Sequence, residues 1–272
     1  MKIFKEEFNK LLFLLERGTP FSFSRFSDGE VTILRNKRLV LGDGFFVQGD
    51  IHGDNPYRVP QNTYPDEERK DFDPSKDSFF HKKLTEAFLY RKENYFKGIP
   101  PQNGGHDKDS SWHFCVDLYG SGDDKHLSFS NVMINDNYRF FIKDMLPIIK
   151  TKKVVLVSNE NSNLEDLPFE VVKHFPIGSN CFKNDYYLID ACKQWIKDNE
   201  IKDHLFLFAA SSLSNLLCYE LYKDFDQNQY MDIGSSLGPY LRLEGWKGTR
   251  TYLHTFWSNP HNPAPQDVDL WN

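Results

Sequence analysis

The second half of the chain alternates short apolar runs with amphipathic segments. Four apolar runs predict buried strands, at residues 153–158, 169–174, 205–210 and 229–233. Segments 186–198 and 211–225 lie between them and predict helices. Strands that alternate with helices need crossover connections, and such connections join parallel strands. We therefore predict an α/β fold, a single Rossmann-like domain with a mostly parallel sheet flanked by helices.

The first half follows the same alternation less regularly. The pattern predicts helices at 3–17, 28–36, 79–91 and 138–149, and strands at 21–24, 38–41, 45–48 and 127–130. Two polar segments, 49–78 and 100–126, interrupt it, and we interpret them as insertions in one catalytic domain spanning 1–272. We expect the aromatic, Pro- and Asn-rich tail, 245–272, to pack on the body of this domain.

Composition narrows the classes of function. A net charge of −6 argues against a nucleic-acid partner, because a groove that follows phosphates carries a basic patch. The four cysteines are far apart and form no CxxC pair, which favours reduced thiols in the cytoplasm. No apolar run approaches the ~18 residues of a membrane span. The sequence leaves formation of a homo-oligomer open.

The strongest candidate chemistry follows the first predicted strand, in the segment from Arg25 to Glu30. Asp28 and Glu30 stand one glycine apart at the end of this strand, and two such carboxylates can bind one Mg²⁺ or Mn²⁺ ion. Arg25 suits a phosphate or a carboxylate partner, and Gly29 lets a ligand approach the backbone. An alternative is purely structural: Asp28 caps the next helix, and Glu30 is an acid of its first turn.

Three further strand ends carry polar residues. Ligands of open α/β sheets bind at this edge. The candidates are Glu160 after the strand at 153–158, Ser211 and Ser212 at a helix start suited to phosphate, and Asp232, Gly234 and Ser235 after the last strand. Each of these segments also has a purely structural interpretation, as a solvated loop, a helix cap or a tight turn. The chain has no G-x-G-x-x-G, P-loop, G-x-S-x-G or H-E-x-x-H motif, which weakens dehydrogenase, NTPase, serine-hydrolase and zinc-protease functions.

The segment Ser24-Arg25-Phe26-Ser27-Asp28-Gly29-Glu30 resembles the N-terminal signature of the GT-D-type glycosyltransferases. The segment from Met231 to Leu237 is similar to the Asp-x-Gly-Ser segment of that family. The resemblance spans residues 21–241, with two anchors and a looser middle. Ser27 stands where the family has Gly, Gly238-Pro239 stands where an acid is expected, and both insertions have no counterpart.

The resemblance implies a GT-D-like fold and a metal-dependent transferase. A nucleotide-sugar donor, commonly a UDP-sugar, would give its sugar to a glycan or glycoprotein acceptor in the synthesis of a surface polysaccharide or glycoprotein. Asp28 and Glu30 would hold Mn²⁺ or Mg²⁺ and act in catalysis with Asp232. The donor-binding residues would be Arg25, Ser27, Gly29, Glu160, Ser211, Ser212, Gly234 and Ser235.

Several points stay open at this stage. An inverting transfer needs a general base, for which Glu160, Asp232, His52 and Asp54 are all candidates. A metal-dependent phosphoesterase or nucleotide hydrolase on the same kind of sheet is one alternative function. A non-catalytic partner in a glycan-assembly complex is another.

Overall fold

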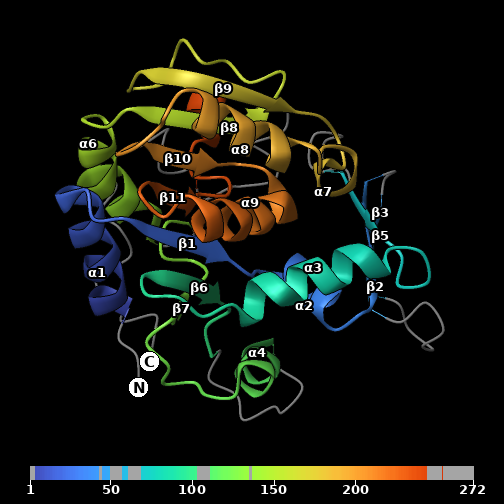
Figure 1. Cartoon of the computed structure of the whole chain (residues 1–272). Coiled ribbons are helices and arrows are strands. Elements are labelled where there is room, and N and C mark those ends of the chain that lie inside the picture. The colour runs from blue at the N-terminus through green and yellow to red at the C-terminus, as the bar shows by residue number, and fades with distance from the viewer. Residues whose placement is uncertain are drawn as a thin grey trace.

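A seven-stranded parallel sheet forms the centre of the protein (Figure 1). The computed structural model describes residues 4–42, 45–49, 57–60, 69–102, 111–134, 137–243 and 253. The strands of the sheet are β1 (Phe21–Arg25), β6 (Tyr95–Ile99), β7 (Leu127–Phe129), β8 (Val154–Asn159), β9 (Val171–Ile177), β10 (Leu205–Phe208) and β11 (Gln229–Asp232). They lie in the order β7-β6-β1-β11-β10-β8-β9, and every paired neighbour is parallel. The predicted α/β class is confirmed.

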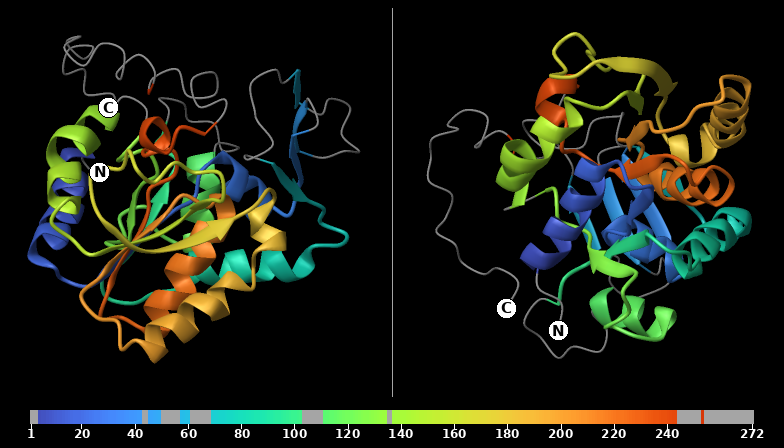
Figure 2. Two further views of the ribbon diagram at one scale, coloured as in Figure 1. Left: turned by 90° about the horizontal axis from the view of Figure 1, so that it is seen from above. Right: turned by 60° about the vertical axis from the view of Figure 1, so that its left-hand side comes forward.

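Helices cover both faces of this sheet (Figures 1 and 2). One face carries α2 (Asp28–Leu34), α3 (Ser78–Leu89), α4 (Ser111–Tyr119), α7 (Cys181–Asn184), α8 (Leu188–Asp198) and α9 (Ser211–Asp224). The other carries α1 (Phe4–Arg17), α5 (Tyr138–Phe140), a π-helical turn (Phe141–Met145), α6 (Leu146–Ile149) and α10 (Gly238–Leu241). The sheet is therefore the middle layer of three.

The side chains of each central strand divide between two hydrophobic clusters. On β10, Leu205 and Leu207 belong to the cluster beneath α1, whereas Phe206 and Phe208 belong to the cluster beneath α9. All four are fully buried. Successive side chains of a strand point to opposite faces, so a strand covered on both faces is apolar throughout. This explains why the pattern predicted β8 and β10 well. The strand predicted as buried at 169–174 corresponds to β9, which lies at the edge of the sheet with Val172 exposed.

A smaller antiparallel sheet lies beside the first one, at the right of Figure 1. It contains β2 (Arg38–Gly42), β3 (Phe45–Gly49), β4 (Tyr57–Pro60) and β5 (Lys70–Phe72), in the order β4-β3-β2-β5. The antiparallel pair of β2 and β3 confirms the strands predicted at 38–41 and 45–48.

The polar segment 49–78, interpreted from the sequence as an insertion, contains secondary structure in its described part. This segment contributes β4, β5 and the first residue of α3. In β5, Lys70 and Phe72 are buried and Asp71 between them is partly exposed, which is a strand alternation. A charged residue occupies one of the buried positions, so the alternation is not visible as apolar and polar letters.

Two other elements were missed by the pattern. β6 is a central strand, but Lys97 and Gly98 interrupt its apolar run. Gly98 is needed there because a Cβ would lie 2.9 Å from the carbonyl oxygen of Phe129 on β7. Helix α4 lies within the segment 100–126, which we had interpreted only as an insertion.

The expected packing of the tail concerns residues that are mostly outside the described ones. Leu253 is described, and it is buried in the cluster beneath α1. His52, Asp54 and the rest of 245–272 lie outside the described residues. Among the helices described, none has the length and apolar character to cross a membrane.

Candidate functional site

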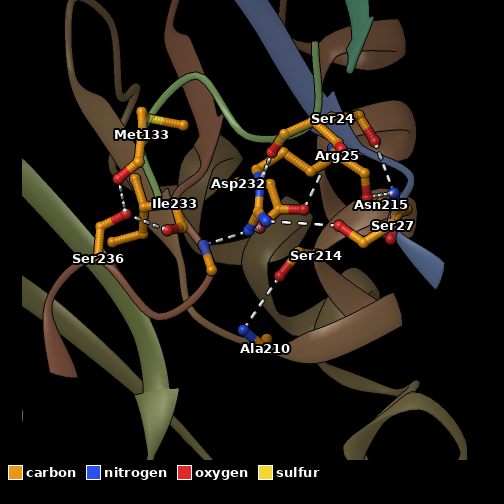
Figure 3. Close-up of polar contacts among 12 residues, drawn as sticks. Ser24, Arg25, Ser27, Met133, Ala210, Ser214, Asn215, Asp232, Ile233 and Ser236 are labelled. Atoms are coloured by element: carbon orange, nitrogen blue, oxygen red, sulfur yellow. Dashed lines mark hydrogen bonds and ion pairs between the residues drawn. The ribbon is translucent and has the colours of Figure 1, made fainter. Parts of the chain in front are cut away.

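The carboxyl ends of β1 and β11 bring the two sequence motifs together. These strands are parallel neighbours, with Phe23 opposite Met231, so Arg25 and Asp232 end up side by side at the same edge. Figure 3 shows both side chains at this edge, with Ser24, Ser27 and Asn215 around them. The sheet topology thus joins segments that are about 200 positions apart in the sequence.

Arg25 is buried and connects three strands. Its backbone N–H donates to Oδ2 of Asp232 at 3.2 Å, and Nη1 lies 3.8 Å from Oδ1 of the same carboxylate. Its Nε donates to the carbonyl oxygen of Ser130, just after β7, at 2.6 Å, and Nη2 lies 3.4 Å from Oγ of Ser27. The guanidinium therefore has its described partners within the protein. It positions the strand ends.

Asp232 is buried against this guanidinium. Burial raises the pKa of Asp232 to about 6, because loss of water outweighs the lowering effect of Arg25, and the charge of Glu30 raises the pKa further. Oδ1 of Asp232 also accepts the backbone N–H of Gly234 at 3.1 Å. Gly234 has φ +52°, and a Cβ there would overlap Nη1 of Arg25. Only glycine suits this position in both backbone conformation and space.

Helix α9 is fastened to β1 by a buried asparagine. Nδ2 of Asn215 donates to the backbone oxygen of Arg25 at 2.7 Å and lies 3.0 Å from Oγ of Ser24. At the start of α9, Oγ of Ser214 accepts the N–H of Ala210 at 3.0 Å. These contacts, visible in Figure 3, fix the first turn of α9 beside the end of β1.

The motif Ser27 to Glu30 forms the start of α2. Ser27 is the N-cap residue, and its backbone N–H donates to Oε2 of Glu30 at 3.1 Å, the reciprocal arrangement of a capping box. The structural interpretation of the motif is thus realised, with Ser27 rather than Asp28 as the cap. Asp28 is the first residue of the helix and is exposed.

The other oxygen of Glu30 takes part in a buried ionic cluster. Oε1 of Glu30 lies 2.7 Å from Nζ of Lys70, which comes from β5 of the small sheet. The hydroxyl of Ser212, in the first turn of α9, donates to the same oxygen at 2.5 Å, and Nζ of Lys70 lies 2.8 Å from this hydroxyl. All three residues are buried. Elements α2, β5 and α9 therefore meet at one charged point.

The two motif carboxylates have opposite electrostatic environments. Burial alone would raise the pKa of Glu30, but the charge of Lys70 and hydrogen bonds from Lys70 and Ser212 outweigh it and lower this pKa. Partial loss of water around its carboxylate and the negative charge of Glu30 raise the pKa of Asp28. Asp28 is the motif carboxylate that faces solvent and that takes up a proton more readily.

The predicted metal pair does not fit the observed arrangement of Glu30. Both of its oxygens have partners, and the ammonium of Lys70 lies where a cation on Oε1 would bind. Within the part of the chain that the structure describes, no group of three or more His, Cys, Asp or Glu side chains is arranged to hold a metal ion. A Mn²⁺ or Mg²⁺ cofactor stays a prediction from the resemblance.

The remaining predicted residues are distributed along the edge. Ser211 is exposed at the first position of α9, with φ +48°, beside Ser212. Ser235 follows Gly234 in the turn after β11. Glu160 is exposed after β8, which β10 separates from β11. Its backbone pairs with Ile177 of β9, so it is not brought to the motif at β1.

Sequence reasoning missed Lys70, Ser130 and Asn215. Asn215 lies four residues after Ser211, one helical turn along the predicted helix, and this spacing was a usable signal. Ser130 is the last residue of a predicted strand, but it contributes only a backbone oxygen. Lys70 had no signal, because it lies in a charged segment.

Comparisons with known proteins support the fold. The sequence matches no model of a known protein family, and no curated protein is similar to it at a significant level. Three solved structures are similar in fold, among them one described as "A New Glycosyltransferase (DUF1792) from Streptococcus sanguinis". That chain is 17% identical, with a TM-score of 0.52, and the match covers 84% of this chain and 80% of that one.

The other two are also DUF1792 structures. One, described as showing that this domain "has a distinct glycosyltransferase fold", is 14% identical, has a TM-score of 0.52, and matches over 84% of this chain and 76% of that one. The second, a selenomethionine form, is 14% identical with a TM-score of 0.50 and covers 84% and 77%. At these identities the comparison establishes the fold, and this chain has a fold similar to that of the DUF1792 glycosyltransferase structures.

Proposed function

We propose that this protein is a glycosyltransferase that moves a sugar from a nucleotide-sugar donor to a glycan or glycoprotein acceptor. One observation carries the proposal: the Arg25–Glu30 motif lies at the carboxyl end of β1, beside the first turn of α9, in a fold shared with glycosyltransferase structures. In open parallel sheets this edge is where ligands bind.

The described contacts support different roles for the residues at this edge. The buried pair of Arg25 and Asp232 positions the strand ends, and Lys70 with the first turn of α9 presents positive charge and amide groups to phosphates. Asp28 is exposed, and it is our candidate general base. Ser211, Gly29 and Ser235 stay candidates for donor contact, whereas Glu160 would reach only an extended donor.

The proposed reaction is a displacement at the anomeric carbon. The acceptor oxygen forms a bond to this carbon while the bond to the donor phosphate breaks. The acceptor proton passes to Asp28, and the electron pair of the broken bond leaves on the nucleoside diphosphate. Positive groups near this diphosphate stabilise its developing charge. A role in surface polysaccharide or glycoprotein synthesis, a UDP donor and a cytoplasmic location belong to the same proposal.

The first experiment measures thermal unfolding with a panel of nucleoside diphosphates and nucleotide sugars. A ligand that binds only the folded state, at about 100 times its Kd, adds about 2.7 kcal/mol to the free energy of unfolding. Stabilisation by one family of nucleotides would identify the base of the donor. A protein that no nucleotide stabilises would contradict the proposal and favour a non-catalytic partner.

The second experiment measures transfer or slow donor hydrolysis by Asp28→Asn. The substitution keeps the shape of the side chain but removes the base, so turnover should fall by about 100-fold or more while the nucleotide still binds. Asp198→Asn is the matched control, because Asp198 is exposed at the last position of α8, which leads into the start of β10 at the opposite edge of the sheet. Turnover of Asp28→Asn close to that of the control would rule out Asp28 as the base. Cleavage of a phosphoester without sugar transfer would indicate a phosphoesterase instead.

A further inference from the structure

We infer that Lys70 is the cation that faces the donor phosphates, and that Glu30 binds this lysine in place of a divalent metal ion. The inference rests on the proposed function for the donor, but its metal-excluding part stands on the structure alone. It deviates from the Asp-x-Glu metal site that the resemblance predicts.

Both carboxylate oxygens of Glu30 have partners within the protein. Oε2 accepts the N–H of Ser27, and Oε1 is shared by Nζ of Lys70 at 2.7 Å and Oγ of Ser212 at 2.5 Å. A divalent ion bound at Oε1 would lie within a few ångströms of the ammonium. Like charges at such a distance repel strongly in a buried site. Metal binding by Glu30 therefore requires Lys70 to leave.

The backbone of Lys70 and of its two neighbours in the chain is held by pairing and hydrogen bonds. In β5 it pairs with Leu41 of β2. The carbonyl oxygen of Arg69 accepts the N–H of Asn180 at 3.0 Å, and the N–H of Asp71 donates to Oδ1 of Asn180 at 3.1 Å. These contacts hold the backbone at Lys70, and Glu30 and Ser212 orient its ammonium. A charge that is already oriented needs little reorganisation when a ligand arrives, which is the condition for strong electrostatic stabilisation.

The ammonium of Lys70 lies beside the start of α9. It contacts Ser212, the second residue of α9, and the free amide groups of a helix start carry partial positive charge. An ammonium has three N–H donors, and the two described partners are Glu30 and Ser212. Lys70 and the first turn of α9 thus present positive charge at the ligand-binding edge of the sheet.

Gly29, between the two motif carboxylates, lies next to the ammonium of Lys70. A Cβ on Gly29 would lie 3.0 Å from Nζ of Lys70 and 3.6 Å from Leu39. The absence of a side chain at this position therefore leaves room for the ammonium. In this chain, the glycine of the Asp-Gly-Glu motif accommodates a lysine.

The first arm of the test uses Mn²⁺ alone, followed by the electron paramagnetic resonance signal of free Mn²⁺. With millimolar Mn²⁺, wild type should show no loss of the free Mn²⁺ signal that depends on Glu30. Lys70→Met should bind Mn²⁺, because it frees the carboxylate of Glu30, and the double variant Lys70→Met/Glu30→Gln should lose this binding again. Mn²⁺ binding by wild type that Glu30→Gln abolishes would overturn the metal-excluding part.

The second arm measures the Kd of the nucleoside diphosphate that stabilises the protein best, in a chelator and in Mn²⁺. Wild type should bind equally well, within about 3-fold, in both solutions. Lys70→Met should bind at least about 10-fold more weakly in the chelator, and Lys70→Arg should keep most of the affinity. A 10-fold loss corresponds to about 1.4 kcal/mol. The same Kd for Lys70→Met and wild type would overturn the role of Lys70.

Matched variants keep the two arms interpretable. Lys193→Met removes an equally paired lysine, bound to Glu220 and Asp224 on the far part of α9, and should leave nucleotide affinity unchanged. Lys70→Met/Glu30→Gln removes both buried charges, so it should fold even if Lys70→Met alone does not. If wild type binds no nucleotide at all, the proposed function fails, while the Mn²⁺ arm still decides whether the Glu30–Lys70 pair excludes metal.

Discussion

Two buried ion pairs lie at the same edge of the sheet, and they are built differently. Arg25 and Asp232 both belong to strands of the central sheet. Glu30 and Lys70 belong to a helix and to the small antiparallel sheet. The first pair is therefore fixed by the fold itself, whereas the second depends on a segment that the central sheet does not need.

The environments of the two carboxylates differ as well. Asp232 keeps a raised pKa of about 6 because its loss of water outweighs the influence of a guanidinium 3.8 Å away. Glu30 has a lowered pKa because the ammonium of Lys70 is 2.7 Å away, and because this ammonium and the hydroxyl of Ser212 both donate to the same oxygen. The closer pair is the one at the proposed phosphate position, where a persistent positive charge is useful. The comparison suggests a supporting role for Arg25 and a ligand-facing role for Lys70.

The largest effect on stability should come from breaking the first pair through Gly234→Ala. The new Cβ would overlap the guanidinium of Arg25, and the backbone at φ +52° is unfavourable for alanine. Strain and overpacking together should lower the free energy of unfolding by about 4 kcal/mol. Urea denaturation measures this change.

Gly18→Ala is its matched control. Gly18 has φ +68°, and no atom of the described residues lies within 4 Å of its Cβ position, so this variant carries only the backbone strain of about 1–2 kcal/mol. Equal losses in the two variants would mean that Arg25 is not held in the described place.

A third buried cation, Lys97 on β6, sharpens the comparison because its described hydrogen bonds go to neutral groups. Its Nζ donates to the carbonyl oxygen of Tyr90 and lies 3.2 Å from the hydroxyl of Tyr119. Burial lowers the pKa of Lys97 to about 7. Between this value and the ordinary pKa of about 10.4, the unfolded chain binds more protons than the folded one, so stability rises with pH.

The prediction is a pH-dependent difference between wild type and Lys97→Met. From pH 7 to pH 9, the free energy of unfolding of wild type should rise by about 2 kcal/mol relative to that of the variant. Parallel urea denaturation series at several pH values measure this difference. A difference independent of pH would show that Lys97 is charged and well solvated in the folded protein.

The smallest effect should come from Gly29→Ala, which perturbs the second pair. Its Cβ would crowd Nζ of Lys70 at 3.0 Å, but a lysine side chain can shift by a few tenths of an ångström. We expect a loss of stability of about 1 kcal/mol or less, with a measurably weaker nucleotide Kd. Unchanged nucleotide affinity would mean that Lys70 does not contact the donor nucleotide.

The sequence predicted most strands of the central sheet and located Arg25 and Asp232 at strand ends, but not their pairing with each other. The apolar runs of β8 and β10 mark strands buried on both faces. Strand β1 alternates Phe and Ser, and Arg25 stands at its end. Asp232 ends the short strand β11. It did not predict β6, where Lys97 lies buried among tyrosines, or β5, where Lys70 takes a buried position. The partners of Lys70 lie 40 and 142 positions away, and those of Lys97 lie 7 and 22 positions away on other elements. Periodicity detects neither kind of partner. The motif carboxylates were located, but the partner of Glu30 was not.

The most direct measurement is a crystal structure of the protein with a nucleoside diphosphate, grown once with a chelator and once with Mn²⁺. The account predicts that, in both crystals, the diphosphate lies within about 3 Å of Nζ of Lys70 and of the amide groups at the start of α9. It also predicts that Glu30 keeps its contact with Lys70. A nucleotide bound away from the carboxyl edge, or a Mn²⁺ ion between Glu30 and the phosphates, would contradict it.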